Sequence, residues 1–356
     1  VCTLVVYQQL QFLQNEKLGF DKENIIVVKN PETLGDKLDV FKQELEQFSF
    51  VKGASICNLL PGTPFSNIGY GAEDVDFSFS LNICLCDEDY KDVLNLEMLE
   101  GRFFSDEYQT DSMGIIINEA AWELLGYDDP IDKKINDWWQ DQHFFHVIGV
   151  VKDFHYESMH QNIRPMGLLN IDGPYEWGAN FISVKVIPGN YQAMIQQINS
   201  IWDQYASGLA FDYSFLEQDY DALYKGEAQT RKLFVIFTIL AIFIASLGLL
   251  GLASFLIEQK TKEIGIRKAL GASVGHITGI LTKEFVRWVI IANVLALPTA
   301  WYLMDRWLQN FEYRISQSWW IFVLASVISL LIAVFTVSFQ TIKTTRKNPI
   351  EALRYE

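Results

Sequence analysis

The sequence predicts an α+β domain outside the cytoplasm that is carried by an all-α transmembrane domain. Three apolar segments, at 233–257, 285–304 and 319–342, each have the length of a membrane-spanning helix. Charge divides the chain at the same place: residues 1–224 hold 13 Lys/Arg and 36 Asp/Glu, whereas residues 225–356 hold 15 and 8. An acidic part joined to a basic, apolar part is typical of an ectodomain on a membrane anchor, and it argues against nucleic-acid binding.

The start of the chain predicts the end of a membrane helix. Residues Val1 to Val6 are apolar, and a Gln-rich helical stretch follows them up to Gly19. No initiator Met and no charged leader region precede them, so no signal peptide is indicated. We therefore expect residues 1–19 to be the end of a first transmembrane helix with its stalk, in a fragment that lacks most of that helix.

Residues 20–216 predict the extracytoplasmic domain. A strand, an amphipathic helix at 33–49 and a second strand follow one another within 24–57, and the same order returns within 179–217. Two such units on one sheet would make a split ferredoxin-like layer. The piece between them, at about 66–176, is expected to be an inserted β-rich subdomain.

The clearest strand of that insert is Val75 to Leu85, because apolar and polar residues alternate along it without a break. The alternation predicts one buried face and one face in water. We also expect a helix at Glu119–Leu125 and a strand at His143–Lys152.

Residues 217–356 predict a second stalk helix, at 217–232, followed by the membrane part with its three apolar spans. The loop 258–284 carries five Lys/Arg and the tail 343–356 carries four, whereas the loop 305–318 carries two. Because positive charge accumulates on the cytoplasmic side, this pattern places the first loop and the tail inside and the acidic domain outside.

A basic run between the first two spans is the best candidate for a functional site. Glu258 with Lys262, and Glu263 with Arg267, are four residues apart with the acid first, which is the better order for a helical ion pair. Ser273 is placed to cap the next helix. A short surface helix held between two spans suits docking onto a partner better than it suits chemistry.

The run Lys262–Ser273 resembles the signature of FtsX/MacB-type ABC transporter permeases, and the segment Asn348–Arg354 resembles the cytoplasmic end of the same family. Three further segments, Gly101–Phe104, Ile116–Asn118 and Val147–His155, resemble the MacB-like periplasmic core domain. In this family, the loop that corresponds to this run, between the spans 233–257 and 285–304 of this chain, is a coupling helix that contacts the ATPase.

The resemblance assigns roles within that coupling helix. It implies charged contacts with the ATPase from Glu263, Arg267 and Lys268, while Ile264 and Ile266 fill a groove of the ATPase. The whole set that it assigns to ATPase coupling is Lys262, Glu263, Ile264, Gly265, Ile266, Arg267, Lys268 and Gly271.

The resemblance also implies partners and a location. A permease module of this family has four spans, of which three remain here, in a bacterial inner membrane. The expected partners are a cytoplasmic ABC ATPase, the lipid bilayer and a second permease module, which is either a homodimer partner or a duplicated half; a periplasmic adaptor stays open. Members of the family expel drugs or peptides, extract lipoproteins or activate cell-wall hydrolases.

The sequence lacks the motifs that common enzyme classes need. It contains no G-x-x-x-x-G-K-[ST] phosphate loop, no G-x-S-x-G and no H-E-x-x-H. We therefore expect no enzyme and no cofactor in this chain, with ATP bound by the partner subunit. The alternative is a membrane protein for signalling or for control of a cell-wall hydrolase, without transport.

Other conspicuous residues remain open or receive ordinary interpretations. Four histidines, His143, His146, His155 and His160, lack the spacing of a zinc site, so no metal is expected. The pair Trp138–Trp139 fits a partner patch as well as it fits packing. We take the cysteines to be free thiols, while a bridge from Cys57 to Cys84 or Cys86 stays open outside the cytosol.

Overall fold

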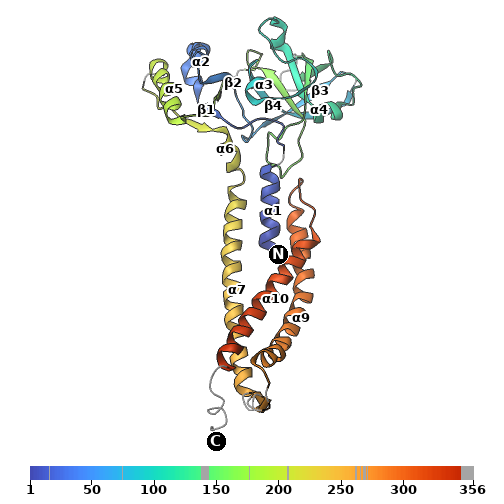
Figure 1. Cartoon of the computed structure of the whole chain (residues 1–356). Helices are drawn as coiled ribbons and strands as arrows, with labels where there is room; N and C mark the ends of the chain where they lie inside the picture. Colours follow the sequence, from blue (N-terminus) through green and yellow to red (C-terminus); the bar gives the residue numbers. More distant parts are fainter. Residues whose placement is uncertain are drawn as a thin grey trace. The chain divides into compact units, whose positions relative to one another are not determined.

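A computed structural model describes most of the chain (Figure 1). The described residues are 1–15, 17–73, 75–137, 144–175, 177–206, 208–260, 263–264, 266–267, 270 and 272–345. The chain divides into two compact units, which we call the sheet unit (Glu16–Lys225) and the helical unit (Val1–Asn15 with Gly226–Glu356).

The sheet unit is built on one eleven-stranded sheet. At one end, four strands lie in the order β11-β1-β10-β2, and every neighbouring pair is antiparallel. Their bounds are β1 Ile25–Lys29, β2 Val51–Cys57, β10 Phe181–Val186 and β11 Tyr213–Phe215. Apolar residues are packed on both faces of these strands, which is why β1 reads as a nearly continuous apolar run.

Two helices cover one face of this four-stranded part: α2 (Leu38–Glu46) and α5 (Tyr191–Tyr205). Phe41 of α2 meets Trp202 of α5 edge to face, with ring centroids 5.7 Å apart. Both rings belong to one buried cluster with Ile26 and Val28 of β1. Burying two aromatic side chains of this size is a large apolar contribution to the unit's stability.

The predicted single helix at 33–49 is wrong. The segment folds as a 3₁₀ helix, Pro31–Lys37, followed by α2 from Leu38. Gly35, inside the 3₁₀ segment, has φ 52° and ψ −131°, a conformation outside the helical region, and it kinks the segment although the apolar spacing continues through it.

The other strands of the sheet close into a ring. β4 pairs with β3 on one side and with β9 on the other, and β7, β8 and β6 complete the path. The bounds are β3 Ser66–Ala72, β4 Val75–Cys86, β6 Gly114–Asn118, β7 Lys134–Asp137, β8 Phe144–Val151 and β9 Met166–Asn170. β5 (Met98–Gly101) pairs with β8 outside the ring. Closing the ring removes the free edges that these six strands would otherwise present.

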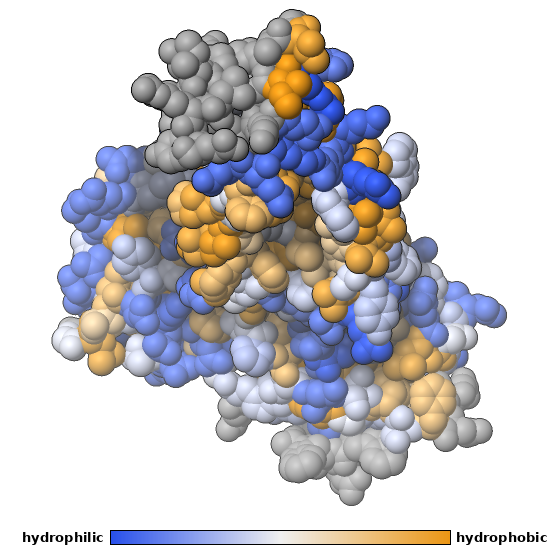
Figure 2. Space-filling view, turned by 90° about the horizontal axis from the view of Figure 1, so that it is seen from below, coloured by the Kyte–Doolittle hydropathy of each residue, from blue (hydrophilic) through white to orange (hydrophobic). Residues whose placement is uncertain are grey.

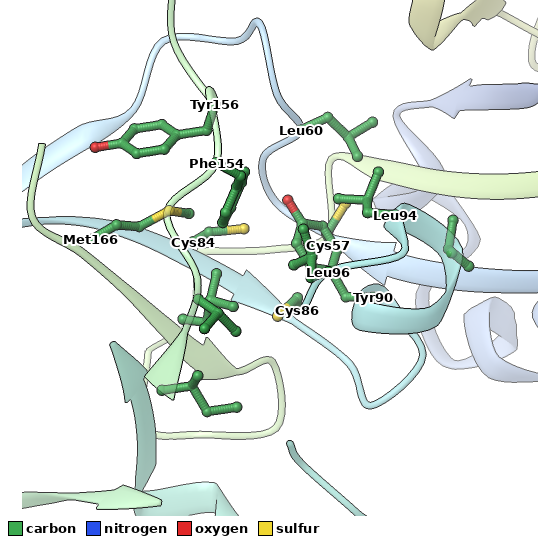
Figure 3. Packing of buried hydrophobic residues seen from close by; sticks show 14 of the residues in the cluster. Cys57, Leu60, Cys84, Cys86, Tyr90, Leu94, Leu96, Phe154, Tyr156 and Met166 are labelled. Atoms are coloured by element: carbon green, nitrogen blue, oxygen red, sulfur yellow. The ribbon is translucent and has the colours of Figure 1, made fainter. Parts of the chain in front are cut away.

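β4 was predicted to have one buried and one solvent-exposed face, and that prediction is wrong for its second half, residues 81–86. Every residue from 81 to 86 is buried. Ile83 and Leu85 belong to the ring's core cluster, whereas Cys84 and Cys86 point into a second cluster (Figure 3). In this half of the strand the polar positions, Asn82 and Cys84, are therefore buried as well, because a core lies on each side of it, whereas Ser78 and Ser80 in the first half are exposed.

A single residue pair joins the two parts of the sheet. Cys57 of β2 lies opposite Cys86 of β4, with Asn58 N donating to Leu85 O at 3.0 Å beside it. Asp87 reinforces this junction, since it accepts hydrogen bonds from Ser55 Oγ at 2.6 Å and from Lys42 Nζ at 2.8 Å. Burial raises the pKa of Asp87, and the lysine partly offsets that effect.

The helical unit contains α1 (Cys2–Asn15), α7 (Lys225–Gln259), α9 (Val274–Leu308) and α10 (Trp319–Thr345). Among the described residues, Lys225–Gln259 and Trp319–Lys343 are long and apolar enough to cross a membrane. Apolar residues form large patches on the surface seen in Figure 2. The predicted span at 285–304 lies within α9, which contains Pro298 and is not one of these two helices.

Both predicted stalks differ from the structure. The first helix ends at Asn15 rather than continuing to Gly19, and the predicted helix at 217–232 is interrupted, because α6 (Leu216–Ala222) ends before α7 begins at Lys225. Apolar spacing on either side of a short break looks like one helix in the sequence.

Polar side chains fasten the helices of the helical unit to one another. Asn293 Nδ2 of α9 donates to Ser329 Oγ of α10 at 3.0 Å. Gln340 Nε2 of α10 donates to Ser254 Oγ of α7 at 2.7 Å. Such interhelical hydrogen bonds are typical of helices that pack in an apolar surrounding.

Candidate docking site

The basic run predicted as the site connects α7 to α9. The structure describes residues 263–264, 266–267, 270 and 272–273 of it, so the predicted Lys262, Gly265, Lys268 and Gly271 lie outside the described residues. Ile264 N donates to Lys260 O at 2.9 Å, and Leu270 N donates to Ile266 O at 3.0 Å. These bonds span four residues, as in an α-helix, and the run is helical at residues 263–264 and 266–267, while Leu270 lies in a turn.

Among the described residues of this connection, two ion pairs are formed. Arg267 Nη2 is 2.6 Å from Glu263 Oε1, four residues earlier, and Lys260 Nζ is 3.0 Å from Glu284 Oε2 of α9. About half of the Glu263 and Arg267 side-chain surface is exposed, 52% and 45%. Exposed pairs of this kind contribute only about 0.3–0.5 kcal/mol to stability, so these charges remain available to a partner.

The apolar side chains of the run divide between an inner and an outer face. Ile264 packs against a buried cluster of Ile257, Ile277 and Leu281, which joins the end of α7 to the start of α9. Ile266 is 52% exposed and Leu270 is 84% exposed. Of the two isoleucines assigned to an ATPase groove, the structure therefore turns Ile266 outward and Ile264 inward.

Leu270 is the residue that the sequence analysis missed. It stands within the run but was assigned no role, and it is the most exposed large apolar side chain of the chain's described part. Ile266 and Leu270 are two exposed apolar side chains in the same run, and it is groups of exposed apolar residues, rather than single ones, that mark interaction sites. Its signal in the sequence was its distance of four residues from Ile266, which places both on one helix face.

The start of α9 matches the sequence prediction. Ser273 is the N-cap, and its hydroxyl accepts a hydrogen bond from His276 N at 3.2 Å. This bond satisfies one of the amides that a helix leaves free at its start. The run is thus fixed at its far end by the cap, and through Ile264 at its inner face.

The other residues weighed in the sequence do not assemble a second site in the described part of the chain. Within it, no group of three or more His, Cys, Asp or Glu side chains is arranged to hold a metal ion. His155 is buried, and the His160 ring bonds Ser158 Oγ at 2.7 Å. His143 and Trp138–Trp139 lie outside the described residues.

The cysteines are free thiols, and those of the sheet unit are fully buried. Figure 3 shows Cys57, Cys84 and Cys86 among apolar side chains and near Tyr90. Burial raises the pKa of Cys57 and of Cys86, which keeps both protonated and poorly nucleophilic.

Two family models match the chain. The MacB-like periplasmic core domain matches residues 5–201, and the C-terminal FtsX-like permease model matches residues 235–349. The first match covers more than half of the chain. The protein therefore belongs to the family of FtsX/MacB-type ABC transporter permeases.

Individual relatives are distant. The chain is 24% identical over 284 residues to the uncharacterized ABC transporter permease YknZ of Bacillus subtilis, with 75% of this chain and 68% of that protein covered. It is 23% identical over 271 residues to the macrolide export ATP-binding/permease protein MacB of Bdellovibrio bacteriovorus, with 72% and 41% covered. The chain thus spans less than half of that ATP-binding/permease protein.

Among solved structures, the periplasmic region of MacB from Actinobacillus actinomycetemcomitans is similar to the chain, at 16% identity and a TM-score of 0.44. The similarity covers 60% of this chain and 97% of that structure.

Proposed function

We propose that the chain is a permease subunit that passes motion driven by ATP on a separate cytoplasmic ATPase to the sheet unit outside the membrane. The observation that carries this proposal is the α7–α9 connection. It exposes Ile266, Leu270 and the Glu263–Arg267 pair on one side, while Ile264 is packed against both flanking helices on the other. A partner that moves the outer side therefore displaces α7 and α9 with it.

The names of the relatives support an ATP-driven system. Two are named uncharacterized ABC transporter permeases, and others are named macrolide export or probable syringafactin export ATP-binding/permease proteins. By analogy, the work done outside the membrane is the export or extraction of a drug, a peptide or a lipoprotein. ATP is bound by the partner, so this chain needs no cofactor and performs no reaction itself.

The proposal includes a membrane arrangement. α7 and α10 cross the membrane, and α9 crosses it as a third span at 285–304, with Pro298 tolerated where neighbouring helices satisfy its backbone. The loop 258–284 and the tail lie in the cytoplasm of a bacterial cell, and the sheet unit lies outside the inner membrane. A second permease module, from a second copy or a duplicated half, completes the transporter, and an adaptor outside the membrane can join it.

We further propose that β11, β1, β10 and β2 with α2 and α5 are a split ferredoxin-like layer. If the four strands are numbered along the chain, their order across the sheet is fourth, first, third, second. Each of the two strand–helix–strand units supplies two of them, and all neighbours are antiparallel. The closed ring of strands is then the inserted subdomain. The layer is the part that the chain connects to α1, which precedes β1, and to α7, which follows β11 and α6.

The docking role can be tested with one pair of variants. Arg267→Glu places two acidic side chains four residues apart and removes the ion pair. The double variant Glu263→Arg with Arg267→Glu keeps an ion pair but exchanges the positions of the positive and negative charges that a partner would contact. We expect both variants to reach the membrane and both to lose coupling between ATP hydrolysis and transport. If the double variant couples as well as the wild type, the pair only stabilises the helix and the docking role is wrong.

A further inference from the structure

Both ends of the sheet unit meet on one short segment between β8 and β9. We call this segment, Asp153–Ile163, the junction loop. The polypeptide enters the sheet unit after α1, and we call residues 18–20 the entering chain. It leaves through α6 into α7, and we call residues 216–224 the leaving chain. All contacts described below lie within the sheet unit.

The entering chain is bound to the junction loop at close range. His155 N donates a hydrogen bond to Leu18 O at 2.7 Å. The next residue, Gly19, has φ +81°, and a Cβ there would lie 2.8 Å from Asp153 O. The backbones thus approach to a distance that only glycine permits. The Phe20 ring then packs edge to face against Phe154, with centroids 6.3 Å apart.

The leaving chain is bound to the same loop through two tyrosines. Tyr220 Oη of α6 lies 3.0 Å from His155 O and 3.2 Å from Glu157 O, so its one proton is shared between two carbonyl groups. Met159 N donates to Tyr224 Oη at 3.0 Å, one residue before α7 begins. Tyr220 is 1% exposed, and burial raises its pKa, so the hydroxyl stays a donor.

Tyr220 also touches the entering chain directly. Its ring packs edge to face against Phe20, with centroids 5.4 Å apart. One side chain therefore contacts the entering chain and the junction loop while it belongs to the leaving chain. A change in the distance between the two chain ends must strain or break these contacts.

The junction loop is in turn fixed to the ring of strands. Asn82 Nδ2 of β4 donates to Tyr156 Oη at 2.8 Å. Asn118, at the end of β6, donates through Nδ2 to Asp153 Oδ1 at 2.7 Å, and Ala120 N donates to the same carboxylate oxygen at 3.0 Å. The loop is thus anchored to two strands and to the first turn of α4 (Glu119–Leu125).

We propose that Tyr220 is a positioning residue that fastens the chain leading into α7 to the junction loop, so that displacement of this chain reaches the ring of strands. The inference rests on the proposed function, because it names where ATP-driven motion would enter the ring. A merely structural tyrosine would also stabilise the fold, but its loss would leave the response of the ring to ATP unchanged.

The test uses the full chain, purified with its ATPase in lipid nanodiscs, and hydrogen–deuterium exchange with and without a non-hydrolysable ATP analogue. Tyr220→Phe removes the hydroxyl and keeps the ring. The matched control is Tyr191→Phe, which loses the 2.6 Å hydrogen bond to Asn24 Oδ1 in the same unit but away from the junction loop. Tyr224→Phe, which removes the acceptor of Met159 N, repeats the test if Tyr220→Phe does not fold.

We expect ATP analogue to change exchange in the junction loop and ring of the wild type and of Tyr191→Phe. In Tyr220→Phe this change should be lost in both places, while the rate of ATP hydrolysis is retained. An unaltered response of the ring in Tyr220→Phe would overturn the inference and leave the proposed function standing. A wild type whose sheet unit shows no response to the analogue would overturn the proposed function, and the inference with it.

Discussion

Leu270 offers the sharpest test of the docking site, because its exposure separates binding from folding. The side chain is 84% exposed, so Leu270→Ala removes almost no buried surface from the chain itself. We expect the free energy of unfolding to change by no more than about 0.5 kcal/mol. If a partner buries this leucine, the variant loses about 2 kcal/mol of binding free energy, which is a roughly 30-fold weaker Kd.

The assay is the Kd between the chain in nanodiscs and the isolated ATPase, measured beside thermal unfolding of the chain. The matched variant is Leu281→Ala, in the buried cluster beneath the same connection. It should lower stability by about 2–5 kcal/mol, since it leaves a cavity. An unchanged Kd for Leu270→Ala, with the chain folded, would refute the claim that this leucine lies in a docking surface.

Two further predictions concern the sheet unit. Gly19→Ala should lower stability by more than about 1 kcal/mol, because φ +81° and the 2.8 Å approach to Asp153 O leave no room for a Cβ. Gly126→Ala, also at positive φ (69°, with ψ 21° in the left-handed helical region) but with nothing within 4 Å, should cost less in the same thermal unfolding assay, and an equal loss would exclude the close approach as the cause. Burial alone would raise the pKa of Asp21, but the hydrogen bond from Lys185 at 2.7 Å helps to bring it below the ordinary 3.8. The ionised Asp21 carboxylate therefore stabilises the folded chain above about pH 3.8, and this contribution to the free energy of unfolding is lost as the pH falls through the lowered pKa. Lys185→Met should reduce the loss of stability at acid pH. An unchanged dependence of the free energy of unfolding on pH in that range would contradict the role given to the Asp21–Lys185 pair.

The sequence predicted the elements whose signals are local. Helix Glu119–Leu125 was found with the predicted bounds, and Ser273 was found as the predicted cap. Strand β4 was predicted nearly to its observed bounds from its unbroken alternation. These signals arise from neighbours along the chain, so they do not depend on how distant segments pack.

Other features depend on partners that are distant in sequence. β3 contains Gly69 and Gly71 and shows little alternation, so its place between β4 and β7 is evident only from the pairing. β9 is a short run held in parallel by β4, and no local signal indicates such a partner. Both faces of the second half of β4, residues 81–86, are buried for the same reason, since the second core is supplied by other segments.

The candidate site shows the same limit. Spacing alone predicted a helical run with two ion pairs. The Glu263–Arg267 pair is present at 2.6 Å, whereas Lys262 of the predicted Glu258–Lys262 pair lies outside the described residues. Spacing did not predict which apolar side chains face outward, because that is decided by α7 and α9 on either side. Ile264 is held by their cluster, whereas Leu270 is left exposed.

The most direct test of the account is photocrosslinking from the position of Leu270 in living cells. A photoreactive amino acid is placed there in the full chain, and the crosslinked protein is identified by mass spectrometry. Phe144 in the sheet unit, 54% exposed, is the control position. The account predicts a crosslink to an ABC ATPase from position 270 and none from position 144. A crosslink to an extracytoplasmic protein from position 270 would contradict it.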